Sequence, residues 1–230
     1  MLFARVAANR YDAGTPSPHS GSLNPIVPVA MRDPDLQRFI DATAAAFACR
    51  IEPETPLAVL NDNIFGATAD DVGTPPADDS AAPLPVCSHL APALVTAATG
   101  APETAAVADA FSHLAPRLQW RYRPPGANDP DGFAGNHANT IFIGPGGLEE
   151  RHDIRIGASL VAPNVRYPDH DHPPEEMYLV LSPGEWCNAE TAWHEPGIGG
   201  LVHNPPGIVH AMRASDAPLL AIWCLWSCDA

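Results

Sequence analysis

Four residues in the second half of the chain have the types and spacing of ligands to one metal ion. His170, His172 and Glu176 fall within seven residues, and His210 follows a Pro-x-Gly turn further along. Residues at even spacing along a strand point to the same side, so the first three are expected to face one interior. A second strand after the turn is expected to bring His210 to them. The pattern predicts a metal site inside a β-barrel.

Three imidazoles and one carboxylate suit a divalent transition metal. Zn, Fe, Mn, Ni and Co all accept such donors, with Zn or Fe ranked first, and ligand type alone does not choose among them. An open coordination position would let the metal bind a substrate carboxylate and acidify the adjacent Cα proton. Tyr178 lies two residues past Glu176, on the same expected strand face, where it could accept that proton. The alternative is a core tyrosine with an ordinary hydrogen bond.

Two stretches match the motifs of a known superfamily. Residues 170–176 fit H-x-H-x3-E, the core of the first cupin motif, and residues 199–210 fit G-x5-P-x-G-x2-H of the second. The flanks differ, because Asn164 replaces a glycine, Gly184 comes one residue late and Ala214 stands where asparagine is usual. The chain therefore resembles the cupins, which implies a double-stranded β-helix (jelly-roll) barrel.

A longer segment narrows the resemblance. Residues 167–182, together with the Trp-rich ending 221–226, resemble the cupin dimethylsulfoniopropionate lyases over about the last half of the chain. The resemblance implies a metal-dependent carbon–sulfur lyase that releases dimethyl sulfide and acrylate by β-elimination. Carried over by position, it implies Tyr178 as the catalytic base and Tyr167 as a second active-site tyrosine. It also implies the metal ligands, which are His170, His172, Glu176 and His210.

The substrate implied by this resemblance is a small cationic sulfonium carboxylate. Aromatic faces attract such a cation through their π-electrons. The candidates for this contact are Trp186, Trp193, Trp223 and Trp226. Packing in the core is the alternative for each of them.

The remaining pattern predicts a mainly β protein with an N-terminal α-helical region. Residues 1–118 are expected to form an arm over 1–32, a helix that starts at Asp33-Pro34, a loop over 53–85 and two further helices. Residues 119–230 alternate short β-prone runs with turns, which predicts seven or more strands and a cupin barrel that carries the metal site. The helical region is expected to pack on the barrel.

Composition excludes several classes of protein. A net charge of −15 with no basic run argues against nucleic acid as a partner. No apolar stretch is long enough for a membrane span, and the N-terminus lacks a secretory signal, so a cytoplasmic protein is expected. Five scattered cysteines favour a reducing compartment over a disulfide framework. A homodimer is expected only from the resemblance.

Two alternatives to the lyase stay open. One is a related metal cupin that acts on another small carboxylate, and the other is a cupin that binds a small ligand without turnover. Outside the motifs, Glu175 is expected to face solvent and Tyr122 to lie in the core. The other barrel histidines are expected to be structural, namely His152, His194 and His203.

Overall fold

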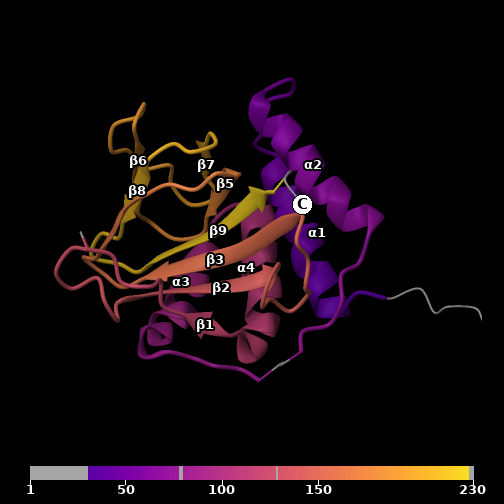
Figure 1. The fold of residues 1–230 in the computed structure, drawn as a ribbon, viewed down its shortest axis with the longest axis horizontal. Coiled ribbons are helices and arrows are strands. Elements are labelled where there is room, and N and C mark those ends of the chain that lie inside the picture. Colours follow the sequence, from indigo (N-terminus) through magenta and orange to yellow (C-terminus); the bar gives the residue numbers. More distant parts are fainter. Residues whose placement is uncertain (1–30, 78–79, 128, 228–230) are drawn as a thin grey trace, which may run out of the picture.

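A computed structural model describes residues 31–77, 80–127 and 129–227, so nearly all of the arm expected over residues 1–32 lies outside the described residues. Helices occupy the first half of the described chain and strands the second. The helices lie on one side of two facing β-sheets (Figure 1). The expected mainly β fold with an N-terminal helical region is confirmed.

Four α-helices in the described part of the chain cover one sheet. They are α1 (Pro34–Ala48), α2 (Pro56–Asp70), α3 (Leu90–Ala97) and α4 (Pro102–Leu114); the short 3-10 turn η1 (Pro85–His89) precedes α3, and η2 (Ala115–Arg117) follows α4. The first helix begins as predicted, because the Asp33 side chain accepts hydrogen bonds from the backbone of Asp35 and Leu36. The prediction of a loop over 53–85 is wrong, since Thr55 caps α2 in the same way and Pro56 opens it.

The strands form a six-stranded and a three-stranded antiparallel sheet. Their orders are β1-β2-β3-β9-β5-β7 and β4-β8-β6. The bounds are β1 Trp120–Arg121, β2 His137–Ile143, β3 Ile154–Val161, β4 Arg166–His170, β5 Glu175–Val180, β6 Glu185–Asn188, β7 Leu201–Asn204, β8 His210–Arg213 and β9 Leu219–Trp226. The sequence did not predict β4 and β6, the outer strands of the smaller sheet.

The central strand β9 explains how two cores share one sheet. Leu220, Ile222 and Cys224 pack among the helices in the larger core, whereas Trp223 and Leu225 belong to a second core between the two sheets. Alternate side chains point to opposite faces, so a strand that is buried on both faces is apolar throughout. The six-stranded sheet thus serves as a floor for the helices and as one wall of the barrel.

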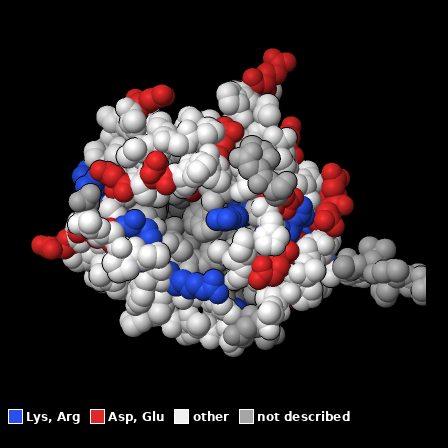
Figure 2. All heavy atoms as spheres, in the orientation of Figure 1, with Lys and Arg blue, Asp and Glu red and all other residues white. Residues whose placement is uncertain are grey.

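The surface is hollowed near the centre of the face seen in Figure 2, between the two sheets. The inner core beneath the hollow contains Tyr167 from β4 and Tyr178 from β5. Tyr122 is not in a core as expected; its exposed fraction is 41% and it stands at the rim of the hollow. Within the described ranges, no helix has both the length and the apolarity that crossing a membrane requires.

Candidate metal centre

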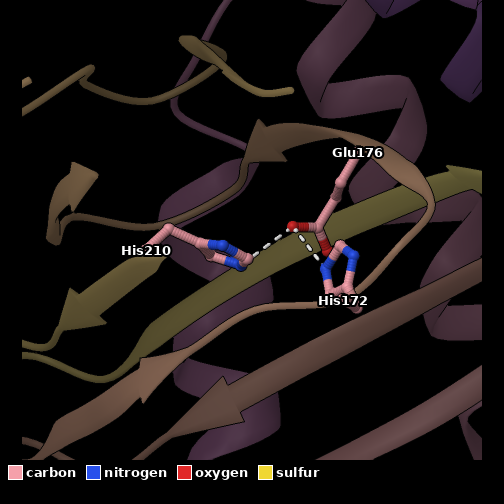
Figure 3. A group of neighbouring side chains, drawn as sticks. All are labelled: His172, Glu176 and His210. Carbon is pink, nitrogen blue, oxygen red and sulfur yellow. Dashed lines mark ion pairs between the residues drawn. The ribbon is translucent and has the colours of Figure 1, made fainter. Parts of the chain in front are cut away.

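Three of the four predicted ligands meet between the two sheets. Nε2 of His172 lies 3.2 Å from Oε2 of Glu176, and Nε2 of His210 lies 3.1 Å from the same oxygen. The carboxylate stands between the two imidazoles (Figure 3). One ligand atom from each residue lies within 4.8 Å of the other two. His172 and His210, which are 38 positions apart in the sequence, therefore belong to one compact donor group.

The route by which the chain assembles this group differs from the prediction. We expected His170, His172 and Glu176 to share one face of a single strand. Instead β4 ends at His170, two prolines at 173 and 174 interrupt the backbone pairing, and β5 begins in the other sheet. The ligands converge because the chain crosses from one sheet to the facing sheet between His172 and Glu176.

The orientation of each histidine is fixed by its own backbone. In His170, His172 and His210, Nδ1 lies 2.9 or 3.0 Å from a carbonyl oxygen two residues away in the chain. A carbonyl can only accept, so Nδ1 carries the proton in all three rings. The lone pair of each neutral ring is therefore on Nε2, the atom that points into the donor group in His172 and His210.

The donor group has the charge and the unpaired atoms that a cation would satisfy. Burial would raise the pKa of Glu176, but His172 and His210 outweigh it and hold that pKa at about 2. Among the described residues, no group forms a hydrogen bond with Nε2 of His172 or His210, although both atoms are buried. Two imidazole nitrogens and an ionised carboxylate oxygen thus converge at 3.1–3.2 Å, a spacing that a positive charge stabilises. A metal ion bonded to the nitrogens and the oxygen at about 2.0–2.2 Å would supply that charge, so the residues fit one.

His170 stands beside this group and not within it. Its ring centroid lies 4.1 Å from that of His210 and 4.9 Å from that of Tyr167. Burial, reinforced by the neighbouring His210, lowers the pKa of His170 to about 4, so the ring is neutral near pH 7. The structure thus separates two histidines that the motif makes equivalent.

Both predicted tyrosines lie in the cavity. Tyr178 follows Glu176 on the inner face of β5, and burial together with that carboxylate raises its pKa well above the usual value. Tyr167 sits across from it on β4, where its hydroxyl accepts a hydrogen bond of 3.2 Å from Nδ2 of Asn139. Ser159 donates to Oδ1 of the same asparagine at 2.7 Å. Burial likewise raises the pKa of Tyr167. Both phenols are therefore neutral near pH 7.

The cavity has a volume of about 430 Å³ and is walled by β1, β2, β3 and the site strands. Of the four tryptophans proposed as cation contacts, Trp223 lines it. Trp186 is buried beside Tyr178, Trp193 lies under an arginine outside the cavity, and Trp226 packs against the helical core. Of these four tryptophans, Trp223 alone can therefore contact a ligand in the cavity.

Sequence reasoning missed several residues that hold the site. Asn204 of β7 donates to Glu176 at 3.2 Å, and its place just before the Pro-x-Gly turn could have indicated it. His137 stacks on Phe133 at 3.7 Å between ring centroids, and both rings pack against Tyr167. Nothing in the motifs indicates this stack, because its members belong to a loop and to β2.

Other barrel residues differ in part from expectation. Glu175 was expected to face solvent, yet its Oε1 lies 2.7 Å from Nε2 of His203 and its side chain is largely covered. This contact gives His203 a structural role. His194 was expected to be structural; it is exposed, and its Nδ1 lies 3.1 Å from the carbonyl oxygen of Ala192.

The fold and the site define a β-barrel of the cupin kind with a histidine–carboxylate centre between its sheets. The family model described as dimethylsulfoniopropionate lyase matches residues 62–221. The chain belongs to that family. The match begins within α2, so the family resemblance extends over α3 and α4 as well as over the barrel.

Two curated relatives and two solved structures are similar to the chain. Dimethylsulfoniopropionate lyase DddQ of Ruegeria pomeroyi is 33% identical over 54% of this chain and 62% of its own. DddL of Cereibacter sphaeroides, provisionally named as such a lyase, is 32% identical over 57% of this chain and 54% of its own. The chain thus spans between half and two thirds of the curated relatives it matches.

The likeness to solved structures extends over more of the molecule. The crystal structure of DddQ from Ruegeria pomeroyi covers 86% of this chain and 94% of its own, with a TM-score of 0.67 and 26% identity. A chain from the structures of the DMSP lyases RdDddP and RnDddQII covers 84% and 93%, with a TM-score of 0.62 and 22% identity, which shows a shared fold.

Proposed function

We propose that this protein is a metal-dependent lyase that cleaves dimethylsulfoniopropionate to dimethyl sulfide and acrylate. The observation that carries the proposal is the position of Tyr178 in the same cavity as His172 and Glu176, which form one donor group with the buried His210. Membership of the lyase family and the names of its relatives support the choice of substrate. The cavity volume of about 430 Å³ suits a small molecule.

The proposed ligands are His172, Glu176 and His210, with His170 as a fourth donor from the adjacent ring. When bound, a divalent transition metal, with Zn or Fe ranked first, supplies a Lewis acid that polarises a substrate carboxylate and favours the phenolate of a nearby tyrosine. The protein contributes the orientation of the rings through their Nδ1 hydrogen bonds. Asn204 holds the carboxylate of Glu176 in place.

The proposed reaction is a β-elimination that starts at Tyr178. Its phenolate oxygen takes the proton from Cα, the C–H electron pair forms the Cα–Cβ double bond, and the Cβ–S bond breaks with its electrons on sulfur. Dimethyl sulfide leaves and acrylate remains. Tyr167 is proposed to hydrogen bond to the substrate, since Asn139 fixes its hydroxyl by donating to it and leaves its proton free to donate into the cavity. Trp223 is proposed to face the sulfonium.

Headspace gas chromatography of dimethyl sulfide tests this proposal. The purified, metal-analysed protein is incubated with dimethylsulfoniopropionate beside three variants. His210→Ala should lose metal and activity, whereas Tyr178→Phe should keep its metal and lose activity. His194→Ala is the matched control, because this exposed histidine has the same Nδ1 contact to a carbonyl two residues away and should change neither.

Each alternative has its own outcome in this experiment. Metal-loaded protein that releases no dimethyl sulfide would leave a cupin for another small carboxylate, or one that binds a ligand without turnover. Full activity in Tyr178→Phe would remove the proton-accepting role from that residue. A cytoplasmic location and a homodimer remain part of the proposal, and sedimentation of the purified protein tests the second.

A further inference from the structure

The charge around the cavity is opposite to that of the whole molecule. The chain has 27 acidic and 12 basic residues, and every basic residue is an arginine. Yet Arg121, Arg123 and Arg155 line the cavity, where Glu176 is the sole carboxylate among the described lining residues. Figure 2 shows basic side chains around the central hollow and acidic ones mainly toward the periphery. The cavity is therefore a positive opening in a negative surface.

Two of these arginines have no acidic partner. Seven of the ten arginines that the structure describes form an ion pair with Asp or Glu, as the excess of acids favours. Arg123 is one of the seven and pairs with Asp129. Arg121 and Arg155 have no carboxylate within ion-pair distance among the described residues. Their charge is left for solvent or for a ligand, and both side chains are exposed.

The sheet registers place both guanidinium groups on the inner wall. Arg155 of β3 pairs with Leu225 of β9, which pairs with Glu176 of β5. Paired residues point to the same face, and neighbouring strands are about 4.8 Å apart, so the backbone of Arg155 is about 10 Å from that of Glu176 across the sheet. In the same way Arg121 pairs with Asn139, the residue that holds Tyr167.

The Arg121 guanidinium is held in this position. Its Nη2 donates to Oε1 of Gln119 at 2.7 Å, and its Nη1 lies over Gly146. That glycine has a φ of +74°, and a Cβ added to it would come within 2.6 Å of Nη1. Only a glycine both adopts this backbone angle readily and leaves room for the guanidinium. The turn after β2 thus shapes the cavity mouth around an arginine.

We propose that Arg121 and Arg155 form an anion-selective entrance that takes small monocarboxylates into the metal cavity. The inference rests on the proposed function only for the identity of the substrate. An incoming carboxylate is attracted by two exposed guanidinium groups before it reaches the donor group. A cation that lacks a carboxylate is repelled by them. The entrance therefore attracts the anionic end of a zwitterion. Its cationic end contacts Trp223 and the inner wall.

The size of the effect follows from distance and screening. For a carboxylate that approaches to about 10 Å from one guanidinium group in a water-like medium, the unit charge changes a binding constant about twofold, and direct contact at the mouth increases this. Added salt weakens it, because the screening length is about 10 Å at 0.1 M and about 3 Å at 1 M. We expect a loss of about threefold in kcat/KM for each arginine and about tenfold for both, with kcat unchanged.

The test compares Arg121→Gln, Arg155→Gln and the double variant with Arg50→Gln. Arg50 is the matched control, since it also lacks an acidic partner among the described residues but lines a different surface pocket. Turnover of dimethylsulfoniopropionate is measured from 50 to 500 mM NaCl. Binding of propionate and of its neutral analogue propionamide is measured separately by quenching of tryptophan fluorescence, with Trp223 in the cavity wall as the reporter.

The expected result is a kcat/KM that falls with salt in the wild type and stays nearly flat in the double variant, together with propionate binding about tenfold weaker and propionamide binding unchanged. Equal losses for both probes, equal losses in Arg50→Gln, or wild-type affinity for propionate in the double variant would each overturn the proposal. If the wild type releases no dimethyl sulfide, the proposed function fails, and the propionate titration still decides the role of the entrance.

Discussion

Gly157 should resist substitution because the indole of Trp223 occupies the place of a side chain there. A Cβ built on Gly157 would lie 2.2 Å from Cζ2 of Trp223 and 2.5 Å from the carbonyl oxygen of Thr140. Backbone cannot withdraw easily, so in Gly157→Ala the indole must move toward the cavity or the strands must separate. Overpacking of this kind costs about 1–3 kcal/mol. For a chain of this size that corresponds to a fall of about 3–10 °C in Tm.

Differential scanning calorimetry of the purified variant measures this loss. Gly66→Ala is the matched control, because Gly66 lies inside α2 and an added Cβ there meets no atom within 4 Å. That change should stabilise the protein by about 0.5–1 kcal/mol through helix propensity. A Gly157→Ala variant with a Tm equal to or above that of the wild type would refute the reasoning. A red-shifted tryptophan emission would show that Trp223 has moved.

Three further predictions concern caps, positioning and metal. Asp33→Ala should cost about 1 kcal/mol at pH 7, measured by urea unfolding. Burial would raise the pKa of Asp33, but hydrogen bonds from Leu36 and Arg117 outweigh it and lower that pKa. The variant should therefore lose the full stability above pH about 4, and the difference from the wild type should vanish as the pH falls through the pKa of Asp33 in the folded protein. Asn139→Leu should reduce dimethyl sulfide release at least tenfold while metal content stays constant, because Tyr167 loses its hydrogen-bond donor. Removal of metal by a chelator should lower Tm, and calorimetry with metal added back should restore it.

The ligands could be predicted because each motif is local and chemically specific. Their exact assembly could not, since the parity argument assumed one strand where two prolines move the chain to the facing sheet. Strands β4 and β6 escaped prediction for a related reason. Both are short, β4 contains Pro168, and both pair with β8 from further along the chain, so non-local contacts decide their structure. Thr55 followed by Pro56 is a recognisable helix start, but the hydrophobic residues of α2 lack the regular spacing that would have indicated a helix.

The residues that support the site were harder to predict from sequence. Asn139, Ser159 and Asn204 are ordinary polar residues in strands, and their roles depend on which strands become neighbours. Cavity lining is equally non-local, which is why four tryptophans seemed equivalent and one lines the cavity. Tyr122 was assigned to the core because strand tyrosines usually pack there, whereas β1 ends one residue before it.

The separation of the site between strands has a consequence for how the protein could be altered. The candidate ligands come from β5, β8 and the turn after β4, and their rings are oriented by nearby backbone carbonyls. The opposite wall comes from β1 and β3, with its two arginines that have no acidic partner in the described part of the chain. Mutations in the wall can therefore accumulate without disturbing the histidine tautomers. Reactive centre and selectivity can diverge independently, so libraries at Arg121 and Arg155 that keep Asn139 and Gly157 unchanged are the rational starting point for redirecting this scaffold to new carboxylates.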